Sequence, residues 1–368
     1  MLVLAMLTLV IPTLAKAESA GSPPFKQVLP GYQYQFPRDF FSHDDFRIEW
    51  WYYTGHLEDD SGRQFGYQLT FFRVALEGKE KIENASKWKI DQIYFAHLAV
   101  SDLQEQKFYH FERINRRGIM NAGAKSDRLL VWNEDWVLVD RDQSHRMKAV
   151  ENGTGLDLKL TPVKALVFHG ADGVSRKGSE EGNASHYFSY TRMKTEGQIF
   201  IKGKSFQVHG LSWMDREFSS DQLNLELAGW DWFAFQLNDG SELMLYQLRK
   251  KDGSIDAFSS GSLIDPKNKS KHLKLKEFTV TVKDYWRSKK TSIRYPSAWL
   301  VTLPGENTRL TVTPDLNDQE LSNLRSIAGS YWEGSVTVKG THLGKPVEGK
   351  GFVELVGYGK PLRQELPE

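Results

Sequence analysis

A run of aromatic and polar residues near the start of the chain recurs about 180 residues later, and this internal similarity constrains the fold more than any other feature. The first copy comprises Trp50–Leu57, a turn ending at Gly62 and Tyr67–Leu69, and the second comprises Trp230–Leu237, Asp239-Gly240 and Tyr246–Leu248. Later segments match in the same order: Gly197–Gly203, Val208–Gly210 and Trp213-x-Asp215 parallel Gly334–Gly340, Val347–Gly349 and Phe352-x-Glu354. Matches at both ends indicate tandem duplication of one module, with a boundary between Phe218 and Leu227.

Each copy alternates apolar with polar or small residues, which is the period of a β-strand. Phe65, Tyr67, Leu69 and Phe71 show the pattern in the first copy. Turn-forming pairs such as Asn152-Gly153 separate the strands, and the best helical window is Asp318–Ile327. The sequence therefore predicts an all-β chain of antiparallel sandwiches or barrels, too long at 368 residues for one small barrel.

Composition excludes several function classes. The chain has 48 Lys and Arg residues against 47 Asp and Glu, so charge gives no argument for a nucleic acid or an anionic membrane as the main partner. It has no cysteine, which excludes disulfide frameworks, thiolate zinc sites and cysteine nucleophiles. The histidines show no metal-ligand spacing and no nucleotide-binding motif is present, so we expect neither a metal nor a cofactor.

The first 17 residues resemble a secretory signal peptide. An uncharged run, Leu2–Leu14, precedes Ala15-Lys16-Ala17, a small-x-small cleavage pattern. The run lacks a basic start, which fits a true start codon further upstream, and the alternative is a buried N-terminal helix. We expect cleavage near Ala17, and a secreted protein that is periplasmic in a Gram-negative cell. No second apolar run is long enough to span a bilayer, so the mature chain is expected to have no transmembrane segment.

Acidic residues among aromatic ones are the strongest candidates for chemistry. Strand alternation places Asp231 on the same face as Phe233, Phe235 and Leu237. Burial among apolar side chains raises the pKa of a carboxyl, and an acid that stays protonated near neutral pH can donate a proton in catalysis. The alternative is a structural aspartate bonded to an arginine or to the backbone.

Three other segments combine charged or nucleophilic residues with aromatic ones. Glu49 shares a strand face with Trp51, and an ion pair with nearby Arg47 is the favoured interpretation. The run Trp213–Ser220 holds Asp215, Arg216 and Glu217 at the predicted domain junction, where Arg216 is expected to pair with Asp215, with Glu217 or with a carboxylate of the other half. The segment Asn183–Tyr190 contains a Ser, a His and a Tyr, although closeness along one strand does not make a catalytic triad.

Four segments resemble the lipocalin-like family that includes secreted AttH-type proteins and the carotenoid 1,2-hydratases. They are Phe46–Gly55, Asn183–Tyr187, Ser212–Ser220 and Gly229–Phe233, and the resemblance covers about residues 37–360. It implies two tandem lipocalin-like (calycin) antiparallel β-barrels, which we place at 37–220 and 221–362. Function in this family is less uniform than fold, because its members are described as secreted hydrolases, as hydratases and as proteins associated with ABC-transport genes.

The resemblance also implies a site. The acid site of the hydratases maps onto Asp231 and onto Asp215 and Glu217, which we take as candidate catalytic residues. The candidate ligand-binding residues are Glu49, Trp50, His186, Tyr187, Trp213, Arg216, Trp230 and Trp232. The hydratases have a histidine where this chain has Arg216, and an arginine cannot shuttle protons at neutral pH.

Two functions from different classes remain, a carrier and an enzyme, and the presence of Arg216 favours the carrier. The first is a carrier that holds a small hydrophobic ligand, a lipid or an isoprenoid, in an aromatic-lined cavity and serves an ABC transporter. The second is a hydratase-like enzyme that protonates an isoprenoid double bond, with Asp231 as the acid and tryptophan rings stabilising the cation. A secreted hydrolase that uses Asp231 with Asp215 or Glu217 is a weaker third.

Overall fold

The computed structural model describes residues 25–76, 90–220, 226–326 and 329–359, and within them the chain forms two antiparallel sheets. The expected signal peptide, residues 1–17, lies outside the described residues. The helices of the described chain are 3₁₀ turns: η1 (Arg38–Phe40), η2 (Leu275–Glu277) and η3 (Pro304–Glu306). None of them is long enough to cross a membrane.

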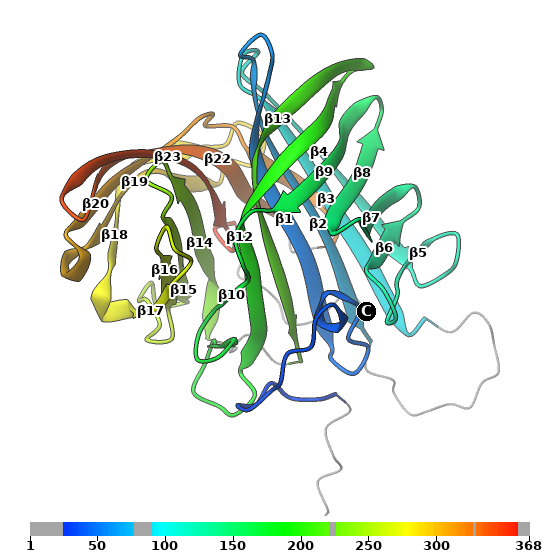
Figure 1. Ribbon diagram of the computed structural model, residues 1–368, viewed down its shortest axis with the longest axis horizontal. Helices are drawn as coiled ribbons and strands as arrows, with labels where there is room; N and C mark the ends of the chain where they lie inside the picture. The colour runs from blue at the N-terminus through cyan, green and yellow to red at the C-terminus, as the bar shows by residue number, and fades with distance from the viewer. Residues whose placement is uncertain (1–24, 77–89, 221–225, 327–328, 360–368) are drawn as a thin grey trace, which may run out of the picture.

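The first sheet runs in the order β4-β3-β2-β1-β13-β12-β9-β8-β7-β6-β5, with β10 and β11 paired to β12. Its strands are β1 (Ile48–Asp59), β2 (Gln64–Ala75), β3 (Gln92–Asp102), β4 (Lys107–Arg116), β5 (Ala122–Ala124), β6 (Leu130–Asn133), β7 (Trp136–Arg141), β8 (Ser144–Glu151), β9 (Thr154–Pro162), β10 (Val167–Phe168), β11 (Val174–Arg176), β12 (Ala184–Ile201) and β13 (Lys204–Ser219). The sheet curls until β4 meets β6, where Asn115 Nδ2 donates to Asn133 Oδ1 (2.7 Å), and it forms a nearly closed barrel (Figure 1).

The second sheet runs in the order β17-β16-β15-β14-β23-β22-β20-β19-β18, with β21 paired to β22. Its strands are β14 (Leu227–Leu237), β15 (Glu242–Lys250), β16 (Ser260–Ile264), β17 (Ser270–Lys274), β18 (Thr279–Arg287), β19 (Arg294–Leu303), β20 (Thr308–Pro314), β21 (Glu320–Leu324), β22 (Gly329–His342) and β23 (Lys345–Leu355). From the central pair outward, the order matches that of the first sheet: β14 to β17 take the places of β1 to β4, and β23, β22 and β20 take those of β13, β12 and β9.

Strand register shows which of the internal sequence matches are structural. Leu57 pairs with Gly210 in the first sheet and Leu237 pairs with Gly349 in the second, so the matches of β1 with β14 and of β13 with β23 are in register. Two other matches are wrong. The β12–β13 hairpin turns at Lys202-Gly203, whereas the β22–β23 hairpin turns at Leu343-Gly344 and leaves Lys339-Gly340 inside a strand.

The other mismatch lies in β2 and β15. His56 pairs with Gly66 and Gln236 pairs with Glu242, so the counterpart of Tyr67 is Leu243 and not Tyr246. The two turns have the same form, because Asp59 N–H donates to Arg63 O and Leu237 N–H donates to Ser241 O, but the strands of the first hairpin continue two residues further before they turn, which shifts β2 relative to β15. The predicted helix at Asp318–Ile327 is also wrong, because β21 forms there against β22.

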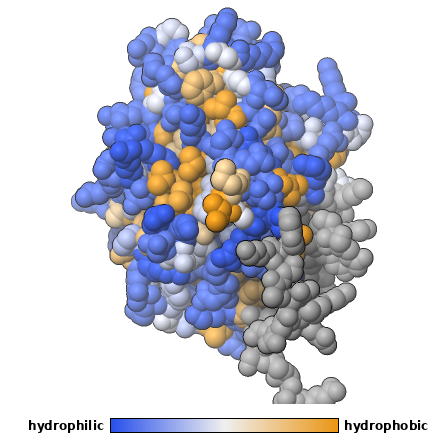
Figure 2. Space-filling model, turned by 90° about the vertical axis from the view of Figure 1, so that its right-hand side faces the viewer, coloured by the Kyte–Doolittle hydropathy of each residue, from blue (hydrophilic) through white to orange (hydrophobic). Residues whose placement is uncertain are grey.

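The two sheets have separate cores and a third apolar layer between them. Residues such as Trp51 and Met214 fill the first core, and Phe233 and Val353 belong to the second. Outward-facing residues of β1, β12 and β13 pack against those of β14, β15 and β23. The central strands therefore bury both faces. The opposite side of the first barrel is mostly hydrophilic, with small separate apolar spots (Figure 2).

Candidate active site

Asp231 lies on the face of β14 that carries Phe233 and Phe235 of the second core. Its carboxylate accepts hydrogen bonds from Arg249 Nε (2.8 Å) and from the Tyr358 hydroxyl (3.0 Å). Burial raises the pKa of Asp231, and the charge of Arg249 opposes that shift. The strand face is the expected one, and the arginine partner matches the structural alternative for this residue.

The neighbours of Asp231 point the other way. Trp230 and Trp232 extend from the opposite face of β14 into the layer between the sheets, where Trp232 packs edge-on against Tyr52 with ring centroids 5.2 Å apart. Asp215 is in that layer as well. The structure therefore places Asp231 apart from the other two candidate acids.

Glu49 and Arg216 face the core of the first barrel and pair with each other. Arg73 is the second cation on Glu49, and His43 donates its backbone N–H to the same carboxylate (3.1 Å). Burial alone would raise the pKa of Glu49, but the two guanidinium groups outweigh it and hold the pKa well below the usual range. The expectation that Arg216 pairs with Asp215, Glu217 or the other half is wrong, because alternation along β13 sends Arg216 to the opposite face from its neighbours.

His186 lies at the end of the first barrel, against the segment that precedes β1. Its ring packs on Tyr32 (centroids 4.2 Å apart) and on Phe218, and Tyr34 contacts its Nδ1. Burial lowers the pKa of His186 to about 4, so the ring is neutral near pH 7. It belongs to an aromatic cluster that closes the barrel, apart from the acids between the sheets.

Asp215 stands at the centre of the layer between the sheets and brings three predicted residues together. Its carboxylate accepts hydrogen bonds from the Tyr187 hydroxyl (2.7 Å), from Trp213 Nε1 (2.6 Å) and from the Ser189 hydroxyl. Trp232 Nε1 donates in turn to the Tyr187 hydroxyl (3.1 Å). Asp215 is only 4% exposed, and burial raises its pKa to about 7 in spite of these donors.

Glu354 is the counterpart of Asp215 in the second half. It pairs with Trp232 across β14 and β23, as Asp215 pairs with Tyr52 across β1 and β13. Trp230 Nε1 donates to Glu354 Oε2 (2.7 Å). Burial raises the pKa of Glu354 to about 7, and the charge of Asp215 adds to the shift.

Two further carboxyls border the pair. Glu333 lies directly opposite Glu354 on the adjacent strand β22, an arrangement that is unfavourable when both are ionised. Burial, and after it the charge of Glu354, raises the pKa of Glu333 well above its usual value. Glu217 accepts a hydrogen bond from the Ser185 hydroxyl and lies 4.0 Å from Lys177 Nζ.

Sequence reasoning missed Glu354 and Glu333 as site residues. The parallel between Trp213-x-Asp215 and Phe352-x-Glu354 contained the signal for Glu354, because a candidate acid in one copy implies its counterpart in the other. Glu333 had no such signal, since its counterpart strand was matched out of register.

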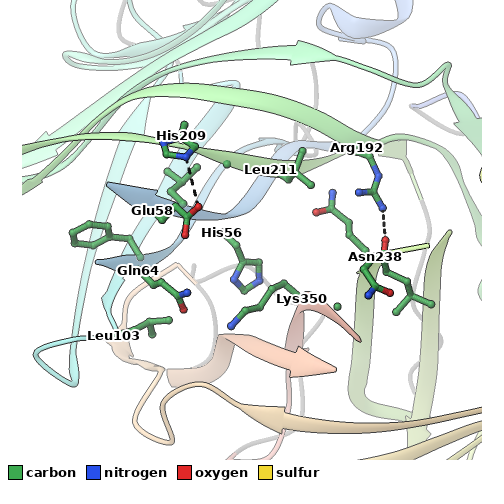
Figure 3. A pocket seen from close by; sticks show the side chains of 15 residues that line it. His56, Glu58, Gln64, Leu103, Arg192, His209, Leu211, Asn238 and Lys350 are labelled. Atoms are coloured by element: carbon green, nitrogen blue, oxygen red, sulfur yellow. Dashed lines mark hydrogen bonds and ion pairs between the residues drawn. The ribbon is translucent and has the colours of Figure 1, made fainter. Parts of the chain in front are cut away.

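The carboxyls of Asp215, Glu217, Glu333 and Glu354 lie in the layer between the sheets, and we call this region the acid layer. It opens toward both ends of the sheet interface. At one end Trp50, Trp230 and Glu354 remain partly exposed. At the other end lies a cleft of about 300 Å³, where His56 and Lys350 project between the sheets and His209 contacts Glu58 at the rim (Figure 3). A recess of about 10 Å³ continues from His56 to Trp213, whose indole N–H binds Asp215.

No group of three metal-ligating side chains is found among residues 25–76, 90–220, 226–326 and 329–359. In the same residues neither Asp215 nor Glu354 has a basic side chain within 4 Å. The carboxyls therefore depend on neutral donors, and burial controls their proton affinity.

The pKa of Asp215 predicts how stability depends on pH. Its folded-state pKa of about 7 exceeds the ordinary value of 3.8, so its contribution to stability is complete below about pH 4 and is lost as the pH rises through about 7. At about 1.4 kcal/mol per pKa unit, the loss is a few kcal/mol. Denaturant unfolding of wild type and of Asp215→Asn at about pH 5 and 8 measures it. We expect the variant to lose less stability over that range, and equal losses would place the pKa of Asp215 near 4.

Comparison with known proteins agrees with this architecture. The family model described as AttH-like matches residues 27–358, and the chain belongs to this lipocalin-like family. A crystal structure of an AttH protein from Nitrosomonas europaea superposes with a TM-score of 0.81 at 36% identity and covers 91% of this chain and 100% of that one.

Two matches are to kievitone hydratases. The curated enzyme from Fusarium solani subsp. phaseoli is 23% identical over 221 residues, which are 59% of this chain and 61% of that protein's length. The crystal structure of kievitone hydratase from Nectria haematococca superposes with a TM-score of 0.70 at 15% identity, covering 92% of this chain and 98% of that one. The second match shows the shared fold alone.

Proposed function

We propose that this protein is a hydratase-like enzyme that adds water to a carbon–carbon double bond of a small apolar molecule held between its two barrels. The observation that carries the proposal is the acid layer: Asp215 and Glu354, from equivalent strands of the two halves, both have pKa values near 7 among aromatic side chains. A general acid or base works best when its pKa lies near the working pH.

The geometry supports one assignment of roles. Protonated Asp215 gives its proton to one alkene carbon, and the cation that forms on the other carbon is stabilised by the ring faces of Tyr52 and Trp232. Water adds to the cation, and its surplus proton passes to ionised Glu354, so that alkene and water give an alcohol. One proton must then return to Asp215 and one must leave Glu354 to restore the starting state. Asp231, bound to Arg249, takes no part.

The donors around Asp215 suit this chemistry. Tyr187 and Trp213 are oriented toward its carboxylate, so the charge that develops as the proton leaves is already solvated. The likeness to kievitone hydratase, in sequence and in fold, favours hydration over other acid-catalysed reactions.

A carrier is the second candidate, and the cleft at His56 favours it. A concave site of about 300 Å³ bordered by Phe65 and Leu211 accommodates a small hydrophobic ligand without chemistry. In this alternative the protein is secreted after cleavage near Ala17, is periplasmic in a Gram-negative cell and passes a lipid or isoprenoid to an ABC transporter.

Incubation of the purified protein with kievitone, in water labelled with heavy oxygen, separates the two candidates. The expected product is heavier by one labelled water molecule, and its rate of formation peaks near pH 7 and falls on either side, because Asp215 must be protonated and Glu354 ionised. Asp231→Asn is the matched control and should retain turnover. Tight binding of kievitone without conversion would favour the carrier. The absence of both binding and conversion would exclude kievitone-like ligands.

A further inference from the structure

His169 links the two sheets next to the acid layer. It follows β10 and is buried, and its Nε2 lies 2.8 Å from the hydroxyl oxygen of Ser189 on β12. Its Nδ1 lies 2.8 Å from the hydroxyl oxygen of Ser262 on β16 of the other sheet. The ring also packs on Tyr187, with centroids 4.2 Å apart.

Ser262, His169, Ser189 and Asp215 form a row of hydrogen-bonded side chains. The positions of the hydrogens in this row follow from counting protons. Ser189 has one hydroxyl proton, and when Asp215 is ionised this proton is donated to its carboxylate. His169 Nε2 must therefore carry the hydrogen of the His169–Ser189 bond. Burial lowers the pKa of His169 to about 3, so the ring is neutral and Nδ1 accepts the proton of Ser262. The donors consequently point in one direction, from Ser262 through His169 and Ser189 to Asp215.

We propose that His169 is a positioning residue of the acid site: it fixes the Ser189 hydroxyl so that its only proton faces Asp215, and in this way sets the proton affinity of that carboxyl. The inference rests on the proposed function only in giving the Asp215 proton a catalytic use. His169 makes and breaks no covalent bond, because its role is to hold a neighbouring dipole in place.

Among the residues that the structure describes, few other titratable groups act on Asp215 or His169. The titratable groups that act on Asp215 or are acted on by it are Tyr52, Tyr187, Glu217 and Glu354. Those that act on His169 are Lys177 and His272, and both oppose its protonation. Each of these groups is unchanged in the variants below, so a shift in the Asp215 titration reports on the row itself.

Infrared titration of the protonated carboxyl band, assigned to Asp215 by its loss in Asp215→Asn, tests the proposal without a substrate. A hydrogen bond to an ionised group shifts a pKa by about one to two units, so Ser189→Ala should raise the Asp215 midpoint by about that much. His169→Leu frees the Ser189 hydroxyl and should raise the midpoint by about half as much. His169→Gln supplies an amide N–H in place of Nε2 and should restore the wild-type midpoint.

Ser262→Ala is the matched control. It removes the same bridge between the sheets as His169→Leu but leaves the Nε2 hydrogen directed at Ser189, so the midpoint should stay at the wild-type value while the melting temperature falls. Equal shifts in His169→Leu and Ser262→Ala, or no shift in His169→Leu, would overturn the proposal and leave His169 as a structural link. If the Asp215 midpoint shifts in His169→Leu but the wild-type protein does not convert kievitone, the proposed function is rejected and the positioning role is retained.

Discussion

Asp215→Asn is expected to lower kcat/KM for hydration by about 10²–10⁴-fold, which is the usual contribution of a general acid. An amide cannot supply the proton, yet it is nearly isosteric and can keep hydrogen bonds with Tyr187 and Trp213. The melting temperature at pH 7 should therefore equal or exceed that of wild type, since the variant removes a carboxyl whose ionisation is unfavourable in its buried position.

The matched control for this prediction is Asp231→Asn on the other face of β14. Both aspartates are buried and both lose only their charge, but Asp231 is bound to Arg249, which would then lack its partner. We expect Asp231→Asn to melt lower than wild type and to retain turnover. Full activity in Asp215→Asn together with loss in Asp231→Asn would reverse the assignment of the acid.

Glu49→Gln should destabilise the fold by about 3–5 kcal/mol, the cost of removing one partner from a buried ion pair. Two guanidinium groups, of Arg73 and Arg216, would remain inside the first barrel without a countercharge. The neutral amide keeps the volume of Glu49, so the loss reports on charge and not on packing. Denaturant unfolding at pH 7 measures it.

Glu58→Gln is the control for Glu49→Gln, because it makes the same change on the same strand. Glu58 is half exposed and pairs with His209 at the surface, where ion pairs contribute little. We expect a change of less than about 1 kcal/mol. A loss of similar size in both variants would show that the buried network is solvated.

Strand alternation and internal similarity were sufficient to predict an all-β chain built from two copies of one module, and the family resemblance added the lipocalin-like fold. Alternation placed Asp231 on the correct face of β14, but it could not show what covers each face, because that strand is buried on both sides: Asp231 belongs to the second core and Trp232 to the layer between the sheets. A buried aspartate gives the same sequence pattern on either face of the strand. Sequence alone therefore could not distinguish the second core from the layer between the sheets.

Partners distant in sequence were equally hard to predict. Arg47 stands two positions from Glu49, yet the ion pairs with Glu49 come from Arg73 on β2 and Arg216 on β13, which only the sheet order brings to its side. His169 is a lone histidine in a short loop, and its role depends on serines from two different sheets. No local sequence pattern predicts a contact between one histidine and serines of two different sheets.

The covalent connection between the barrels has a consequence for the kind of surface they can share. Ser219 ends the first sheet and Leu227 begins the second, so the halves meet as parts of one molecule at an effective concentration in the millimolar range. Two free subunits would have to bury more apolar area to associate at cellular concentrations. Because the two halves are covalently connected, they do not need this additional apolar area. Their contact surface can therefore contain carboxyl groups whose repulsion would separate two free chains. Duplication followed by fusion is therefore a route by which a subunit contact can come to contain buried carboxyl groups.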